Sequence, residues 1–205
     1  MSLFITFEGG EGAGKSFQSR ALYGRLSKLA VPVVLTHEPG VTPLGRKITR
    51  WLKWGDGMAV SPTAELMLFN ASRAQLIEEV IRPELEEGKV VICDRYTDST
   101  IAYQSHGRGL DPATVKAVNE AAVQGVVPDL TILLDIAAGD GFARKKGQKP
   151  DRFEREAAGF HRRVREGYLK LAEKEPERWL VVDAGQSRER IEQIIWEKVS
   201  GLLKV

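Results

Sequence analysis

The chain contains 205 residues, of which 42% are hydrophobic and 28% are charged, and its formal net charge is +2 at pH 7. These proportions are typical of a soluble globular protein that buries its own core without metals or disulfides. Because the charge is nearly balanced, no overall basic field predicts a nucleic acid or a membrane surface as a partner.

Three local features indicate a cytoplasmic protein. Cys93 is the only cysteine, so the chain can form neither an internal disulfide nor a multi-cysteine zinc site. The first residues lead directly into an apolar segment, without the basic region and small-residue cleavage site of a signal peptide. No uninterrupted apolar stretch approaches the length of a membrane helix. We therefore expect a reducing, cytoplasmic compartment.

Short apolar runs alternate with longer helical patterns along the chain. Such runs are typical of central parallel strands that are covered on both faces. The last helical pattern follows Ser187, a suitable N-cap. The alternation predicts a three-layer α/β fold with right-handed crossovers, and no linker divides it, so we expect one domain over residues 1–205. The strands are expected at Leu3–Phe7, Val31–Thr36, Val90–Asp94, Leu130–Asp135 and Leu180–Asp183.

A glycine-rich segment directly after the first expected strand matches the P-loop pattern G-x-x-x-x-G-K-[ST]. Its glycines allow backbone N–H groups to surround phosphate oxygens at the positive end of the next helix. Lys15 supplies a charge for the β- and γ-phosphates, and the Ser16 hydroxyl is suited to ligate Mg²⁺. We expect ATP to bind here. The segment consists of Gly9, Gly10, Glu11, Gly12, Ala13, Gly14, Lys15 and Ser16.

An aromatic ring and an arginine share one face of a later helical pattern. Phe69 and Arg73 are four residues apart, and Leu66, Ile77 and Val80 continue the same stripe. A stacking ring beside a fixed donor suits a pyrimidine carbonyl. A core phenylalanine with an arginine that reaches the surface is the alternative.

The third expected strand ends in a carboxylate and a guanidinium, Asp94 and Arg95. Asp94 is placed to hold the Mg²⁺ shell or to accept a hydrogen bond from an acceptor phosphate, and Arg95 is placed to clamp a second phosphate. A kinase needs both groups, whereas an ATPase has less use for the arginine. The Asn-Lys-x-Asp and Asp-x-x-Gly motifs of GTPases are absent from the sequence.

A basic segment interrupts the regular alternation between Arg144 and Arg152. It contains Lys145, Lys146 and Lys149, and it is broken by glycine and proline. The composition predicts a mobile loop between two helices, with a solvated surface turn as the alternative.

Taken together, these motifs resemble those of the thymidylate kinases over nearly the whole length of the chain. The similar motifs occur in the family's order, which makes the match more specific than the P-loop alone. The resemblance implies a P-loop kinase fold with a five-stranded parallel sheet and a lid loop. It also implies ATP and Mg²⁺, dTMP as the acceptor, and a homodimer. The motifs are Phe4–Gly9 with the P-loop, Glu38–Gly40 with Thr42–Gly45, Leu68–Gln75, Asp94–Gln104 and Asp151–Glu154.

The resemblance also assigns roles in a dTMP pocket. Phe69 would stack on thymine, and Arg73 would donate to its exocyclic oxygen. Tyr103 would lie against the deoxyribose, where it would crowd a 2′-hydroxyl, and Glu11 would accept from the 3′-hydroxyl. The remaining residues that the resemblance places in or beside this pocket are Glu38, Arg95, Ser99, Thr100 and Gln104.

Phosphoryl transfer requires positive charge around the moving group. Some thymidylate kinases carry an arginine in the P-loop and others supply it from the lid. The P-loop of this chain has none, so the resemblance implies the lid variant, with Arg144 and Arg152 as catalytic candidates beside Lys15, Asp94 and Arg95. Lys145, Lys146 and Lys149 are possible helpers.

Two other functions remain open at the level of sequence. The nearest is a kinase for another nucleoside monophosphate, such as dUMP or a purine deoxynucleotide. The other is a nucleotide-binding regulatory module or ATPase switch, which would hydrolyse ATP slowly without stimulation by a monophosphate.

Overall fold

A central sheet of five parallel strands organises the computed structural model, which describes residues 2–55, 59–145, 147 and 149–204. The strand order is β2-β3-β1-β4-β5, and every neighbouring pair is parallel. The predicted α/β fold with a five-stranded parallel sheet is confirmed. The strands are β1 (Leu3–Glu8), β2 (Val33–His37), β3 (Val90–Asp94), β4 (Leu130–Asp135) and β5 (Trp179–Asp183).

Four strand boundaries differ from the sequence prediction, and one of them is the end of β2, which lies at His37 rather than Thr36. β2 begins at Val33 rather than Val31, because the Val31 N–H bonds to the end of the preceding helix and Pro32 has no N–H to give. β1 includes the charged Glu8, whose carboxylate is buried and held by hydrogen bonds. β5 includes Trp179, which pairs with the start of β4. A polar or aromatic residue at the end of an apolar run therefore belonged to the strand in three cases, Glu8, His37 and Trp179.

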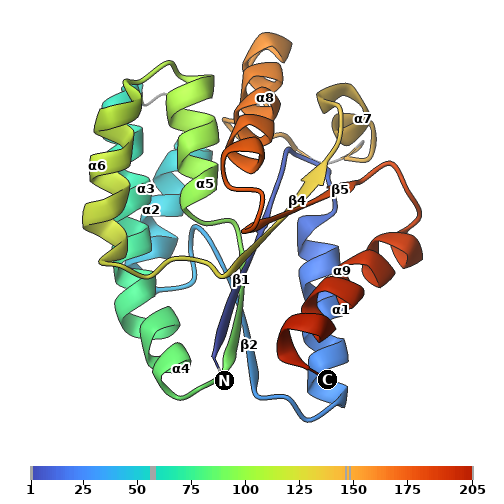
Figure 1. The fold of residues 1–205 in the computed structure, drawn as a ribbon. Helices are drawn as coiled ribbons and strands as arrows, with labels where there is room; N and C mark the ends of the chain where they lie inside the picture. Colours follow the sequence, from blue (N-terminus) through green and yellow to red (C-terminus); the bar gives the residue numbers. More distant parts are fainter. Residues whose placement is uncertain (1, 56–58, 146, 148, 205) are drawn as a thin grey trace.

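Helices cover both faces of the sheet (Figure 1). α1 (Lys15–Lys28) and α9 (Arg188–Leu203) pack together on one face. α8 (Ala158–Lys174) contacts β4 and β5 from the other side. The remaining helices are α2 (Pro43–Trp54), α3 (Pro62–Leu76), α4 (Arg82–Glu86), α5 (Thr97–Thr100), α6 (Pro112–Val123) and α7 (Ala138–Ala143), and two π-helical segments are η1 (Ile77–Ile81) and η2 (Ile101–Gly107).

Side-chain caps explain where four of these helices begin. The hydroxyl of Ser187 accepts a hydrogen bond from the Arg190 N–H, so the predicted N-cap of the last helix is confirmed. The same kind of bond starts three other helices, in which proline also occupies the first helical position. Their caps are Thr42 for α2, Ser61 for α3 and Asp111 for α6.

The hydrophobic core lies on both sides of the central strands. β1 is buried along its whole length, and the inner residues of β3 and β4 are buried with it. On the helical stripe of α3 and η1, Leu66 and Ile77 have 0% exposure and belong to this core. Among the described residues, no helix combines the length and the apolar composition needed to cross a lipid bilayer.

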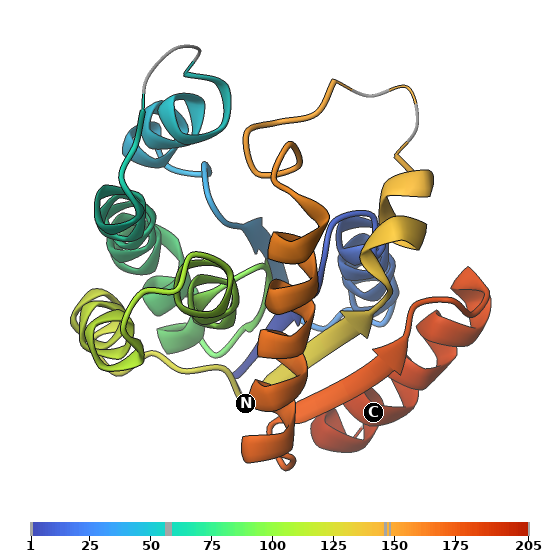
Figure 2. The same cartoon turned by 90° about the horizontal axis from the view of Figure 1, so that it is seen from above.

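Residues 149–157, which precede α8, lie on the same side of the molecule as the end of α2 (Figure 2). The Arg152 N–H donates to the Lys53 carbonyl, and the Lys53 ammonium pairs with Asp151 at 3.4 Å. The predicted lid segment is thus joined at its C-terminal end to α2.

The P-loop and α7 touch backbone to backbone. A Cβ atom added to Gly12, whose φ is +70°, would lie 1.9 Å from the Gly141 oxygen, and one added to Gly141 would lie 2.1 Å from the Glu11 oxygen. Both positions therefore require glycine, because the neighbouring atoms belong to backbone that cannot move aside cheaply.

We predict that Gly141→Ala lowers the free energy of unfolding by about 1–3 kcal/mol, since the added methyl group overlaps the P-loop backbone. Urea unfolding measures this change. Gly139→Ala is the matched control on the same helix, because a Cβ there meets nothing within 4 Å. Equal stabilities of the two variants would contradict the proposed contact.

Candidate active site

The P-loop folds around the side chain of its own lysine. Gly9, Gly12 and Gly14 have φ angles of +136°, +70° and +95°, which side chains rarely allow. The Lys15 ammonium donates to the carbonyls of Gly9 at 3.0 Å and Gly10 at 2.7 Å. Burial, together with the nearby Arg95, lowers the pKa of Lys15 to about 8. An anion at this site would therefore favour the charged form of the lysine.

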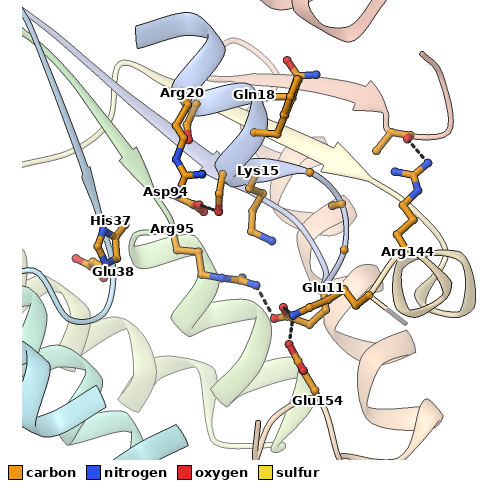
Figure 3. A pocket seen from close by; sticks show the side chains of 18 of the residues that line it. Glu11, Lys15, Gln18, Arg20, His37, Glu38, Asp94, Arg95, Arg144 and Glu154 are labelled. Carbon is orange, nitrogen blue, oxygen red and sulfur yellow. Dashed lines mark hydrogen bonds and ion pairs between the residues drawn. The ribbon is translucent and has the colours of Figure 1, made fainter. Parts of the chain in front are cut away.

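Two side chains with oxygen atoms that can bind a cation, Ser16 and Asp94, lie next to each other beside the P-loop. β1 and β3 are neighbours in the sheet, so the start of α1 lies beside the end of β3. The Ser16 hydroxyl donates to an Asp94 carboxylate oxygen at 2.5 Å (Figure 3). Hydroxyl and carboxylate oxygens suit Mg²⁺, which completes its shell with phosphate oxygens and water. Among the described residues, no group of three or more His, Cys, Asp and Glu side chains is arranged so that it could hold a metal ion.

Arg95 connects the end of β3 to the P-loop. Its φ is +73°, and its N–H donates to the Phe7 carbonyl, so the backbone turns sharply at this residue. Its guanidinium lies 2.6 Å from the Glu11 carboxylate and also donates to Ser99 and to Tyr168. Figure 3 shows Arg95 and Glu11 joined in this way beside Lys15.

Glu11 is the counter-charge of this cluster. Burial alone would raise its pKa, but Arg95, Lys15 and Lys145 together lower it well below its usual range. Tyr103 donates to the same carboxylate at 3.0 Å. Glu11 is therefore ionised at neutral pH and holds the cations together.

Two cavities share one border at this cluster. The larger has a volume of about 1380 Å³ and is lined by P-loop residues 11–16, Asp94, Arg144 and the start of α9. The smaller is lined by side chains of α3, α5 and η2, among them Phe69 and Tyr103. The residues that line both cavities are Glu11, Glu38, Pro39, Lys53, Arg95 and Asp151.

The structure brings together every residue that the sequence placed in the acceptor pocket. All of them line the smaller cavity, although they come from the P-loop, from the segments that follow β2 and β3, and from α3, α5 and η2. They are Glu11, Glu38, Phe69, Arg73, Arg95, Ser99, Thr100, Tyr103 and Gln104.

Arg73 lines this cavity, but its donors are engaged by protein groups. It is 2% exposed, and its Nε and Nη2 atoms each lie 2.8 Å from one oxygen of Glu38. Its other N–H groups donate to Asn70, Asn119 and the Tyr96 carbonyl. Its predicted hydrogen bond to a base oxygen therefore stays a prediction, and the structure gives it a second role as the partner of Glu38.

Glu38 has one oxygen left over. Its Oε1 atom is buried and has no hydrogen-bond partner among the described residues. Burial raises the pKa of Glu38, although Arg73 opposes the shift. A buried acceptor that borders both cavities is suited to a donor group from a bound molecule.

The two lid arginines lie in different places. Arg144 lines the larger cavity and donates to the Ala184 carbonyl at 2.8 Å (Figure 3). Arg152 instead donates to the Leu52 carbonyl and to Glu65, and it is absent from the described lining of both cavities. The structure thus brings Arg144, but not Arg152, to the phosphate loop.

The lysines of the basic segment also have different surroundings. Lys145 pairs with Glu154 and lies 3.6 Å from Glu11. Lys149 lines the larger cavity. Lys146 lies outside the described residues.

Sequence reasoning missed two aromatic groups and a buried carboxylate. Phe153 lines the smaller cavity, and its ring centre is 5.5 Å from that of Phe69. Tyr168, on α8, reaches Arg95 and Glu8. Glu8 could have been found from the sequence, because it directly follows an apolar run that was predicted as a strand. A carboxylate at that position lies at the end of the strand, where the site residues gather. No local signal marks Tyr168, which is far from the other residues in sequence.

Glu8 supports the turn that carries Arg95. Its carboxylate is fully buried and accepts hydrogen bonds from the backbone N–H groups of Tyr96 and Ser99 and from the hydroxyls of Ser99 and Tyr168. Burial and the nearby Asp98 raise its pKa to about 7, against the opposing effects of these hydrogen bonds and of Arg95.

The comparisons with known proteins agree on one family. The family model described as thymidylate kinase matches residues 7–195. A thymidylate kinase of Dehalococcoides mccartyi is 57% identical over 100% of this chain and 99% of its own length. That of Halothermothrix orenii is 49% identical over 98% of each chain. The crystal structure of thymidylate kinase from Ehrlichia chaffeensis superposes with a TM-score of 0.74, at 36% identity, over 88% of this chain and 92% of its own.

We predict that Glu8 makes the folded protein less stable as the pH rises. The folded protein keeps a proton on Glu8 up to about pH 7, whereas the unfolded chain loses it near pH 4.5. The free energy of unfolding therefore falls between these values, by up to about 1.4 kcal/mol per pH unit. Urea unfolding at pH 5 and pH 7.5 should show a smaller fall in Glu8→Gln than in the wild type.

The exposed Glu173 offers a matched control, and Glu173→Gln should keep the wild-type pH dependence. Parallel curves for the wild type and Glu8→Gln would show that Glu8 titrates alike in both states and would contradict the prediction.

Proposed function

The chain belongs to the thymidylate kinase family, and we propose that it transfers the γ-phosphate of ATP to dTMP, giving dTDP and ADP, with one nucleotide in each of the two cavities. The single observation that carries this arrangement is the shared border, where Glu11 and Arg95 line both cavities. A reaction between two nucleotides needs such a place, because both phosphate groups must reach it at once.

Catalysis in this arrangement consists of positioning and of charge stabilisation. ATP lies along the P-loop, with its terminal phosphates against Lys15. Arg95 holds the acceptor phosphate of dTMP at the border. The two phosphates then meet in line, and no covalent enzyme intermediate is needed. Lid closure over the site excludes water, which would otherwise compete as the acceptor.

The residues at the end of β3 fit a divalent cation. Ser16 and Asp94 offer adjacent hard oxygen donors beside the phosphate loop. Mg²⁺ held there would neutralise negative charge on the phosphates of ATP. Hydrogen bonding from Ser16 keeps the Asp94 carboxylate facing this position.

The side chains that line the smaller cavity suit a flat base and a deoxyribose. Phe69 and Phe153 form an aromatic wall, and Tyr103 packs edge-on against Phe153 at 6.3 Å. The Tyr103 hydroxyl is fixed by Arg95 and Glu11. A ring that is held by a neighbouring ring and at its hydroxyl cannot move aside easily, which supports its exclusion of a ribose 2′-hydroxyl.

A homodimer in the cytoplasm remains part of the proposal. Large apolar side chains on α2 and α3 are exposed, with Trp51 54% and Met67 49% accessible, and a second copy would cover such a surface. Leu66 and Ile77, on the same helical stripe as Phe69, are core residues and would not contribute to this interface. The buried Cys93 thiol is consistent with a reducing compartment.

The direct test is ADP production in a coupled assay with ATP and Mg²⁺, with dTMP, dUMP, dCMP, dGMP, AMP or no acceptor. We expect dTMP to stimulate turnover above all the others. Preference for another monophosphate would keep the kinase chemistry and overturn the base assignment. Slow hydrolysis without stimulation by any acceptor would favour the regulatory ATPase.

Lys15→Ala is the variant that ties this activity to the P-loop. It should abolish turnover while leaving the protein folded, because its ammonium serves the phosphates. Lys28→Ala, at the exposed end of the same helix, is the control and should retain normal rates.

The two lid arginines should give different kinetic defects. Arg144 lines the ATP-side cavity, so we predict that Arg144→Ala lowers kcat by about 100-fold and changes the KM for dTMP little. Arg152 braces α2 and Glu65, so Arg152→Ala should mainly lower thermal stability and raise the KM for dTMP. Steady-state kinetics and a melting curve of each variant separate these two effects. A large fall in kcat in Arg152→Ala, with little change in Arg144→Ala, would assign the contact with the transferred phosphate to Arg152.

A further inference from the structure

Glu65 lies behind the wall of the smaller cavity and gathers three side chains. It is fully buried on α3. Its Oε1 accepts from Gln104 at 2.8 Å and from Arg108 at 3.1 Å, and its Oε2 accepts from Arg108 at 3.1 Å and from Arg152 at 2.6 Å. Only Gln104 among these partners lines the smaller cavity.

We propose that Glu65 is a specificity-determining positioning residue, which fixes the Gln104 amide so that the pocket presents a hydrogen-bond acceptor to the base. This inference rests on the proposed function, because it concerns how the acceptor nucleotide is chosen.

The direction of the Gln104 amide follows from the chemistry of its partner. A carboxylate paired with two guanidinium groups has no hydrogen to donate, so it can only accept. Gln104 must therefore turn its NH₂ group towards Glu65. Its amide oxygen is the terminal atom that remains for the cavity, and the amide cannot flip without setting two acceptors against each other in a buried place.

An acceptor at this position discriminates between pyrimidines. Thymine and uracil carry an N–H group at N3, whereas the N3 atom of cytosine is itself an acceptor. A fixed carbonyl oxygen that faces N3 would pair with the first two bases and oppose the third. Polar groups that are fixed and buried in a pocket reject ligands that leave them unpaired. Glu65 thus contributes to base choice without touching the base.

The other contacts of Glu65 define the competing explanation. Arg152 lies over the Phe153 ring at 4.6 Å and Arg108 over the same ring at 5.8 Å, so Glu65 also braces an aromatic wall of the pocket. A purely structural brace would weaken the binding of every pyrimidine alike. Orientation of Gln104 would change the ratio between them.

The experiment is a double-mutant cycle on Glu65→Gln and Gln104→Met, with kcat/KM measured for dTMP and dCMP, or inhibition constants where dCMP turnover is too slow. Glutamine at position 65 both donates and accepts, so it no longer fixes the Gln104 amide. We expect the dTMP-to-dCMP ratio to fall about tenfold in each single variant, mainly through the KM for dTMP. The double variant should show no further fall, because both changes act through one amide.

Glu156→Gln is the matched control. Glu156 pairs with the same Arg108 at 2.5 Å but does not contact Gln104, so this variant should keep the wild-type ratio. An unchanged ratio in Glu65→Gln or in Gln104→Met, or losses that multiply in the double variant, would overturn the inference. If the wild-type protein itself does not phosphorylate dTMP, that result counts against the proposed function instead.

A measurement on the wild-type protein keeps the inference testable if Glu65→Gln fails to fold. The Gln104 side-chain NH₂, assigned by its disappearance in Gln104→Met, should exchange its bonded hydrogen with solvent slowly in ¹H–¹⁵N NMR spectra. Rapid exchange of both hydrogens would show that the amide is free and would overturn the proposed lock.

Discussion

The ion pair between Arg95 and Glu11 is the interaction on which the rest of the site depends. A kinase for a phosphorylated acceptor must concentrate cations where two anions will meet, yet cations repel one another when no anion is bound. Glu11 resolves this conflict, since its carboxylate lies between Arg95 and Lys145 and within the field of Lys15. The same carboxylate belongs to the P-loop, so the pair also joins the ATP side to the acceptor side.

Buried carboxylates organise the next layer of the structure. Glu8 holds the turn after β3, Glu38 is held by Arg73, and Glu65 collects Gln104 and two arginines. Glu8 and Glu65 each accept several hydrogen bonds while fully buried, and Glu38 is paired with a buried arginine, so the orientation of each is costly to change. Side chains that line the two cavities are thereby held in place before a ligand arrives. Such preorganisation is the part of catalysis that a protein of this kind is best able to supply.

Much of the fold and the pocket could be predicted because the signals were local or came in a recognisable order. β3 and β4 have the predicted bounds, and the nine residues assigned to the acceptor pocket all line one cavity. The features that the sequence could not predict have a common cause. Arg152 and Arg144 are alike in the sequence, and only the contacts of Arg152 with the end of α2 and with Glu65 separate them. Phe153 likewise became part of the pocket wall through its packing against Phe69.

The sequence by itself determined the parallel sheet, the phosphate loop and the family, because apolar periodicity, glycine spacing and motif order are properties of neighbouring residues. Only the tertiary structure decided which charges are paired. Arg73 was expected to donate to a bound base, and folding brought Glu38, Asn119 and the Tyr96 carbonyl to it from three other parts of the chain. The physical reason is that a buried charge takes whichever partners the packed elements deliver, and those partners are distant in the chain.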